Sequence, residues 1–107
     1  MLLRGNQMDI NKNKVGDTIN IAVSGRLDTN TAPQLEAVIK ECAAGSRIMN
    51  MDLSAVEYMS STGLRDILLA HKIMGGAGGK LVVKKPSDFV MQVLEATSMD
   101  KLLNIEK

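Results

Sequence analysis

Aromatic residues are nearly absent from this chain of 107 residues, which has one Tyr, one Phe and no Trp. So few rings argue against a surface on which nucleic-acid bases stack. Cysteine is just as scarce: Cys42 stands alone, which excludes an internal disulfide bond and is typical of a reducing compartment. Neither sign of charge dominates, since 13 basic residues stand against 12 acidic ones, and this balance argues against direct nucleic-acid binding.

Long hydrophobic runs are also missing. No apolar segment approaches the roughly 18 residues that span a membrane, and residues 1–7 have neither the charged start nor the hydrophobic centre of a signal peptide. We therefore expect a cytoplasmic protein that does not contact a membrane. Residues 1–7 fit either a loose, flexible leader before an alternative start at Met8 or the frayed terminus of one domain at residues 8–107.

Hydrophobic periodicity predicts that strands and helices alternate along the chain. Strands are predicted at residues 8–14, 18–24, 47–53 and 81–83. Helices are predicted at residues 32–43, at residues 61–74 and after a capping Ser87, with one more helical turn at residues 99–103. The order β-β-α-β-α-β-α predicts an α/β fold with a mixed β-sheet of about four to five strands, flanked by helices.

The two longer helices each show one apolar face. These faces contain Leu35, Val38, Ile39 and Cys42 in the first helix, and Leu64, Ile67, Leu68 and His71 in the second. Thr31 and Gln34 have the spacing of a capping box, and Pro33 fits the first helical turn. Because Cys42 and His71 fall on apolar faces, we interpret them as core residues; the alternative is a nucleophilic Cys–His pair. No set of metal ligands is present.

A glycine-rich run at residues 75–79 separates the second helix from the last predicted strand. A phosphate-binding loop leads from a strand into a helix and continues with Lys and then Ser or Thr. This run has the opposite order and leads into Lys80 and Leu81, so no helix start follows it that would hold a phosphate. We interpret the run as a helix stop and a turn, and we expect no cofactor.

Two polar segments remain, at residues 24–33 and 52–64, and each lies between a strand and the following helix. In a parallel sheet such connections meet beyond the carboxyl ends of the strands, where binding sites form. The second segment places the hydroxyl groups of Ser60, Ser61 and Thr62 at a helix start. One hydroxyl is enough for an N-cap, so the residues alone leave open whether the others have a further role.

The same two segments resemble the signatures of a known family. They contain Gly25-x-Leu27-Asp28 before a helix that opens at Thr31-Ala32, and Asp52-Leu53-Ser54 followed by Tyr58-Met59-x-Ser61-Thr62-Gly63-Leu64. Both are similar to the motifs of STAS domains, and over residues 8–105 the chain most resembles the single-domain anti-sigma factor antagonists. The resemblance implies one STAS domain at residues 8–107, whose mixed sheet has helices on one side.

The resemblance also implies a switch in which this chain is not an enzyme. Ser61 would be the phosphoacceptor of an anti-sigma factor that is itself a serine kinase. The unphosphorylated antagonist would bind that kinase and free a sigma factor for transcription, and a PP2C-type phosphatase would remove the phosphate. We expect the partner to contact residues of both segments, namely Asp28, Thr29, Asn30, Ser60, Ser61, Thr62, Gly63 and Leu64.

One residue departs from the family pattern. The residue before the phosphoacceptor is often Asp, and here it is Ser60, which makes Ser60 a rival acceptor. Asp28 fits either the partner surface or an Asx-turn that leads into the first helix. Two other functions remain as alternatives: a STAS subunit of a transporter or stress-sensing assembly, and a small enzyme that uses Cys42 or His71.

Overall fold

The computed structural model describes residues 8–107, so the leader predicted at residues 1–7 lies outside the described residues. Within residues 8–107 the strands are β1 (Met8–Val15), β2 (Thr18–Leu27), β3 (Ile48–Met59), β4 (Lys80–Lys84) and β5 (Asn104–Glu106). The helices are α1 (Ala32–Ala43), α2 (Ser61–Gly76), α3 (Asp88–Ala96) and the short 3-10 turn η1 (Met99–Lys101).

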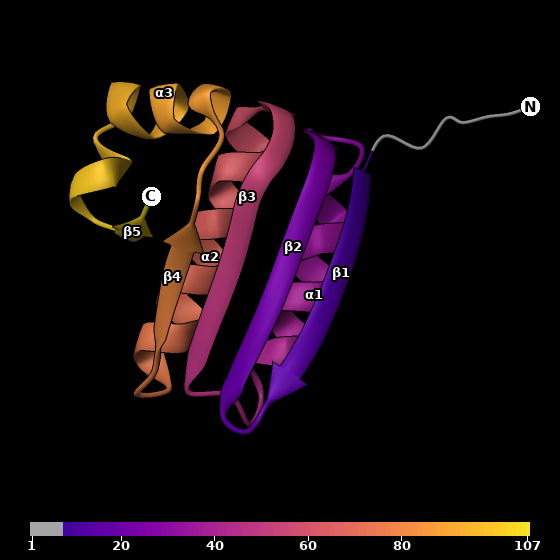
Figure 1. The fold of residues 1–107 in the computed structure, drawn as a ribbon, viewed down its shortest axis with the longest axis vertical. Coiled ribbons are helices and arrows are strands. Elements are labelled where there is room, and N and C mark those ends of the chain that lie inside the picture. Colours follow the sequence, from indigo (N-terminus) through magenta and orange to yellow (C-terminus); the bar gives the residue numbers. More distant parts are fainter. Residues whose placement is uncertain (1–7) are drawn as a thin grey trace, which may run out of the picture.

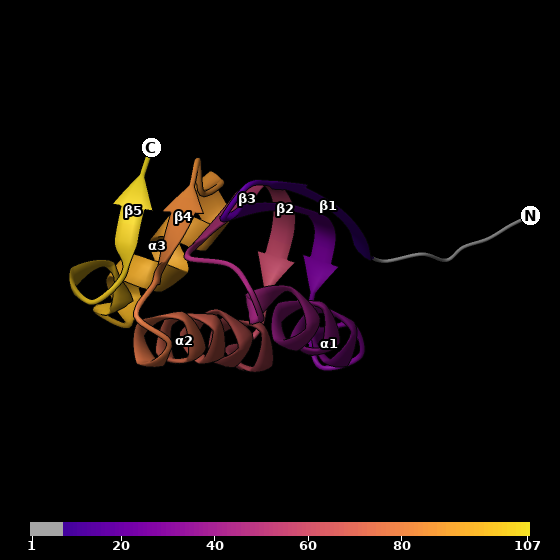
Figure 2. The same ribbon diagram turned by 90° about the horizontal axis from the view of Figure 1, so that it is seen from below.

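The strands form one mixed sheet in the order β1-β2-β3-β4-β5. β1 and β2 pair antiparallel as a hairpin, and each later strand is parallel to the one before it. Figure 2 shows α1 and α2 side by side on one face of the sheet and neither of them on the other. α3 lies near the carboxyl end of β3, at the top of Figure 1. The predicted α/β fold and its element order are confirmed.

The core lies between the sheet and the two helices. Alternate residues of the central strands point into it, among them Ile19, Ile21 and Val23 of β2, and Met49, Met51 and Leu53 of β3. This alternation is the pattern from which the strands are predicted. The core is aliphatic, because among residues 8–107 the cluster of buried side chains contains neither a Phe nor a Tyr.

β2 and β3 extend further than the sequence pattern predicts, to Leu27 and Met59. The pairing of the two strands shifts register between Ala22 and Ser24 and again after Gly25, so β3 bulges against β2. A bulge breaks the strict alternation of apolar and polar residues, which hides the extension from a periodicity analysis. The connections that follow these strands are therefore short: residues 28–31 after β2, and Ser60 alone after β3.

The buried face of α2 differs from the predicted one. Its buried residues are Gly63, Asp66, Ile67, Ala70 and Met74. The predicted Leu64, Leu68 and His71 are only half-buried, so the interpretation of His71 as a core residue is wrong, whereas Cys42 of α1 is buried as predicted. Ile67 is buried as predicted, but hydrophobic periodicity does not select Gly63 or Asp66, which share its buried face.

The remaining boundaries follow the sequence more closely. α2 ends at Gly76, and Gly78 has a φ of +83°, so the glycine-rich run is the predicted helix stop and turn. Ser87 caps α3, since its Oγ accepts a hydrogen bond from the N–H of Val90 (3.2 Å). The helical turn predicted at residues 99–103 is η1, but the sequence pattern does not predict β5 after it.

The packing of α2 against α1 buries the carboxyl group of Asp66. Asp66 is 3% exposed, and among residues 8–107 its Oδ2 atom has no hydrogen-bond partner. Burial, and then the charge of Glu36, raises the pKa of Asp66 to about 6, although Arg65 and Lys40 oppose the rise. Because folding raises this pKa, the ionised carboxyl destabilises the folded state increasingly as the pH climbs from the ordinary value of 3.8 to about 6.

Asp66→Asn should therefore stabilise the protein more at high pH than at low pH. We expect a gain in the free energy of unfolding of about 2–3 kcal/mol at pH 8, and a gain about 2 kcal/mol smaller at pH 4.5. Urea unfolding at both pH values measures the gain. Asp9→Asn, at an exposed carboxylate of β1, is the control and should change stability by less than about 0.5 kcal/mol. If Asp66→Asn raised the free energy of unfolding equally at both pH values, the ionised Asp66 carboxyl would not destabilise the folded state as described.

Candidate functional site

Two connections meet at the carboxyl end of the sheet, residues 28–31 after β2 and Ser60 after β3. The backbone N–H of Ser60 donates to the carbonyl oxygen of Leu27 (2.9 Å). The hydroxyl groups of Thr29 and Thr62 share a hydrogen bond (3.2 Å). These bonds join the two polar segments that the sequence singles out.

Gly63 allows α2 to begin directly against the end of β2. A Cβ atom at this position would lie 2.6 Å from Leu27 Cγ, 2.8 Å from the Leu27 carbonyl oxygen and 3.0 Å from Met59 Cγ. Two of these distances are shorter than any ordinary contact, and one of them involves backbone that cannot easily move. The structure therefore gives Gly63, which we expected to contact a partner, a buried packing role.

Residues 28–31 form an Asx-turn closed by Asp28 and Thr31. Asp28 Oδ1 accepts hydrogen bonds from the backbone N–H groups of Asn30 (3.0 Å) and Thr31 (3.2 Å). Thr31 Oγ1 donates to the carbonyl oxygen of Arg26 (2.8 Å) and accepts from the N–H of Asp28 (2.9 Å). Burial opposes a charge on Asp28, but the hydrogen bonds outweigh burial and lower its pKa, so this carboxylate is ionised at neutral pH.

The capping box predicted at Thr31 and Gln34 is wrong. Thr31 does precede α1, but among the described residues its hydroxyl makes no capping bond to the helix backbone. The hydroxyl is already used inside the loop, where it closes the Asx-turn. α1 has Pro33 in its first turn, as predicted, and the missing N–H of Pro33 reduces the number of helix donors that need a partner.

The three hydroxyl groups at the start of α2 lie in three different environments. Ser60 is half-buried and is the N-cap, because its Oγ accepts from the N–H of Gly63 (3.4 Å). Thr62 is half-buried and bonded to Thr29. Ser61 is exposed, and its hydroxyl makes no hydrogen bond with any residue from 8 to 107. Of the three groups, the Ser61 hydroxyl alone is open to solvent and has no hydrogen-bond partner among the described residues.

The other residues that are predicted to contact a partner differ in how far they are exposed. Thr29 and Asn30 are exposed, and Leu64 is half-buried in the first turn of α2. The side chain of Asp28 is 19% exposed, and its Oδ2 lies 3.6 Å from Arg26 Nε. The hydrogen bonds of Asp28 form the Asx-turn, which is one of the two roles that the sequence suggests for this residue. Arg26, which lies near the end of β2 opposite the bulged part of β3, carries no periodic signal in the sequence.

The residues considered for catalysis lie away from this site. Cys42 is near the last turn of α1, and burial raises the pKa of its thiol, which disfavours the thiolate that a nucleophile requires. Among residues 8–107, no three His, Cys, Asp or Glu side chains are grouped so that they could hold a metal ion. In the same part of the chain, no helix combines the length and the apolar character needed to cross a membrane.

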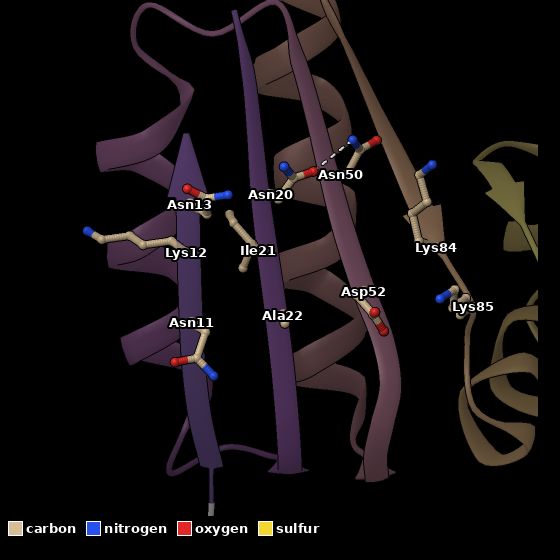
Figure 3. Close-up of a pocket in the computed structure, with 10 residues that line it drawn as sticks. All are labelled: Asn11, Lys12, Asn13, Asn20, Ile21, Ala22, Asn50, Asp52, Lys84 and Lys85. Atoms are coloured by element: carbon tan, nitrogen blue, oxygen red, sulfur yellow. Dashed lines mark hydrogen bonds between the residues drawn. The ribbon is translucent and has the colours of Figure 1, made fainter. Parts of the chain in front are cut away.

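The face of the sheet opposite α1 and α2 is polar. A concavity of about 440 Å³ lies across β1 to β4, and amide side chains are prominent in its lining (Figure 3). Asn50 Nδ2 donates to Asn20 Oδ1 (3.0 Å), and Lys84 forms an ion pair with Glu106 (2.8 Å). Because these groups satisfy one another on an open surface, the concavity is consistent with a solvated sheet face and does not extend the site at the loops.

A mixed sheet with two helices on one face, and a serine-capped helix start where its loops meet, define a small α/β domain. The model of the family described as "Mlab, STAS domain" matches residues 10–104. The chain belongs to the STAS domain family.

Relatives and solved structures described as anti-sigma factor antagonists resemble this chain. The anti-sigma-B factor antagonist of Listeria monocytogenes is 30% identical over 96 residues, which cover 89% of this chain and 84% of that protein. The crystal structure of an anti-sigma factor antagonist from Mycobacterium paratuberculosis has a TM-score of 0.84 at 26% identity, over 94% of this chain and 86% of that one. Unphosphorylated SpoIIAA matches in fold, with a TM-score of 0.80 at 17% identity, over 92% and 89% of the two chains. The resemblance to antagonist STAS domains is confirmed.

Gly63→Ala should destabilise the protein, because the added methyl group overlaps the backbone of Leu27. Overpacking of this kind costs about 1–3 kcal/mol or more. Gly75→Ala is the matched control in the same helix: a Cβ there meets nothing within 4 Å, and the change should be neutral or stabilising by up to about 1 kcal/mol. Thermal unfolding of both variants measures the effect. If Gly63→Ala and Gly75→Ala had the same melting temperature, α2 would be able to begin further from β2 without loss of stability.

Ser60 and Ser61 are neighbours, but replacing each of them by Ala should change the stability of the protein by different amounts. Loss of the N-cap in Ser60→Ala should cost about 1 kcal/mol. Ser61→Ala removes an exposed hydroxyl without a bonded partner in residues 8–107, and should change stability by less than about 0.5 kcal/mol. Urea unfolding midpoints compare the two variants. If Ser61→Ala were the more costly change, Ser61 and not Ser60 would be the cap.

Proposed function

We propose that this protein is an anti-sigma factor antagonist whose binding is controlled by phosphorylation of Ser61. In its unphosphorylated form it binds an anti-sigma factor that is also a serine kinase, and this releases a sigma factor for transcription. The kinase phosphorylates Ser61 with ATP, and a PP2C-type phosphatase removes the phosphate. The chain itself acts as a binding protein and supplies no catalytic group.

The environment of Ser61 carries this proposal. A kinase must take the acceptor hydroxyl into its active site, which requires a hydroxyl that is exposed and not held by the fold. Ser61 meets this requirement, whereas the hydroxyls of Ser60 and Thr62 are engaged in the N-cap and in the bond to Thr29. The partner class comes from the Listeria relative, which is an anti-sigma-B factor antagonist at 30% identity.

The start of α2 favours a phosphate on Ser61. The first N–H groups of a helix lack partners within the helix, and the positive end of the helix dipole attracts an anion. Arg65 is exposed one turn after Ser61 on the same side of α2, where a guanidinium can pair with the phosphate. We therefore expect the fold to survive phosphorylation. The two forms of SpoIIAA, unphosphorylated and phosphorylated, support this expectation, since both match the fold, with TM-scores of 0.80 and 0.74.

The phosphate changes the contact surface much more than the fold. It adds about −1.5 to −2 charges at pH 7 to a position that is neutral in the unmodified protein. A carboxylate of the partner at ~4 Å would be repelled by about 4 kcal/mol per unit charge at an effective dielectric constant of about 20. That energy corresponds to about a thousandfold loss of affinity, which is enough for a switch.

Incubation with ATP and each purified anti-sigma factor kinase of the source organism should place one phosphate on Ser61. Mass spectrometry of the peptides identifies the acceptor. Ser61→Ala should abolish the modification. Ser60→Gly, which keeps most of the capping propensity, and Thr62→Val are the matched controls and should still be phosphorylated.

Two results would contradict the proposal. A phosphate on Ser60 or Thr62 would assign the switch to a neighbouring hydroxyl. If no anti-sigma factor kinase of the source organism binds or modifies the protein, the antagonist function is excluded. A STAS subunit of a different assembly is then the favoured function.

A further inference from the structure

We infer that three stacked side chains, Arg26, Tyr58 and Phe89, form an anchor for the partner beside the phosphorylation switch. We call this group the anchor stack. The inference rests on the proposed function, because the occupant to which it commits is the anti-sigma factor kinase that binds the surface around Ser61. It divides that surface into a switch, which phosphorylation changes, and an anchor, which it does not.

The distribution of aromatic residues is the first observation. The whole sequence has one Tyr and one Phe, and both are in this stack. Aromatic rings commonly provide much of the buried area of a core, yet the core cluster of residues 8–107 has none. Phe89 is instead 37% exposed. A chain that places its few aromatic rings at the surface and builds its core from aliphatic side chains has them available for contact with another molecule.

The three side chains already contact one another in the isolated protein. Arg26 Cζ lies 4.4 Å from the centroid of the Tyr58 ring, and the Tyr58 and Phe89 rings are 5.4 Å apart at an angle of 44°. Arg26 of β2 and Tyr58 of β3 are a registered pair. Phe89 comes from α3, the helix that lies near the carboxyl end of β3 (Figure 1). Ser87 holds α3 in place, because its Oγ donates to the carbonyl oxygen of Val56 (2.7 Å). Side chains that are already ordered lose little entropy when a partner binds.

A series of side-chain contacts links the anchor stack to the residue beside Ser61. Arg26 Nε lies 3.6 Å from Asp28 Oδ2, at the start of the loop of residues 28–31. Thr29 of that loop is bonded to Thr62, the residue after Ser61. The loop of residues 28–31 thus contacts both Arg26 and the neighbour of Ser61, so we expect a partner that covers this loop to meet both.

The chemistry of the stack specifies what the partner presents. The Arg26 side chain is 51% exposed, and Asp28 approaches it only at 3.6 Å, so most of its N–H donors are open to a second carboxylate. The exposed part of Phe89 favours an apolar side chain. The kinase surface should thus offer an Asp or Glu next to an aliphatic or aromatic residue. Arg, Tyr and other aromatic residues of this kind are frequent among the few that dominate binding energy.

Titration calorimetry of the unphosphorylated protein against the kinase that modifies it tests the inference. Arg26→Ala and Phe89→Ala should each raise Kd about 10- to 30-fold. Lys101→Ala and Leu102→Ala are matched controls, an exposed cation and a 50% exposed apolar residue at η1, and should leave Kd unchanged. Circular dichroism melting verifies that each variant is folded, and Arg26→Gln and Phe89→Leu replace any variant that is not.

The outcomes separate the anchor from the proposed function. If the wild type binds and the anchor variants bind equally well, the inference is overturned while the antagonist function stands. If no kinase binds the wild type, both are overturned. If the isolated protein self-associates in sedimentation experiments and Arg26→Ala abolishes this, a second copy of the chain occupies the stack and the inference is also wrong.

Discussion

The contact between the end of β2 and the start of α2 determines the geometry of the whole site. The Leu27 carbonyl oxygen accepts the N–H of Ser60, and the absence of a side chain at Gly63 lets the helix lie directly against Leu27. Because β3 passes into α2 through one residue, nothing between them can flex to change this arrangement. The two loops are therefore held together by backbone packing before any partner binds.

That contact also explains why three consecutive hydroxyl residues have different roles. A helix start turns successive side chains in different directions, so Ser60 faces back to the helix, Thr62 faces the neighbouring loop and Ser61 faces solvent. The groups that maintain the structure are thus separate from the group that is open to modification. A phosphate on Ser61 would break no hydrogen bond among the described residues, which is why we expect a change of surface charge without a change of fold.

Much of the fold could be predicted from the sequence because β2 and the first half of β3 obey a strict alternation and α1 has a clear apolar face. The parts that could not be predicted depend on backbone packing. The bulges of β3 break the alternation, and the buried face of α2 contains Gly63 and Asp66, neither of which hydrophobicity selects.

The candidate site was predictable to the level of its two loops, since connections after parallel strands meet at one edge of the sheet. The resemblance implies Ser61 as the acceptor, but Ser60 stays a rival in the sequence because the sequence does not show which residue caps α2. Arg26 and Phe89 were missed for a similar reason: they contact or adjoin Tyr58 only after β2, β3 and α3 have assembled. Residues that are distant in the chain and exposed leave no periodic signal in one sequence.

We propose that the charge on Ser61 controls binding while the fold stays the same. The most direct measurement is the affinity of the modifying kinase, in the absence of ATP, for the unphosphorylated protein and for the protein carrying one phosphate on Ser61, together with the circular dichroism spectrum of each form. We expect superimposable spectra and an affinity that falls about 100- to 1,000-fold on phosphorylation. Equal affinities of two equally folded forms would contradict it.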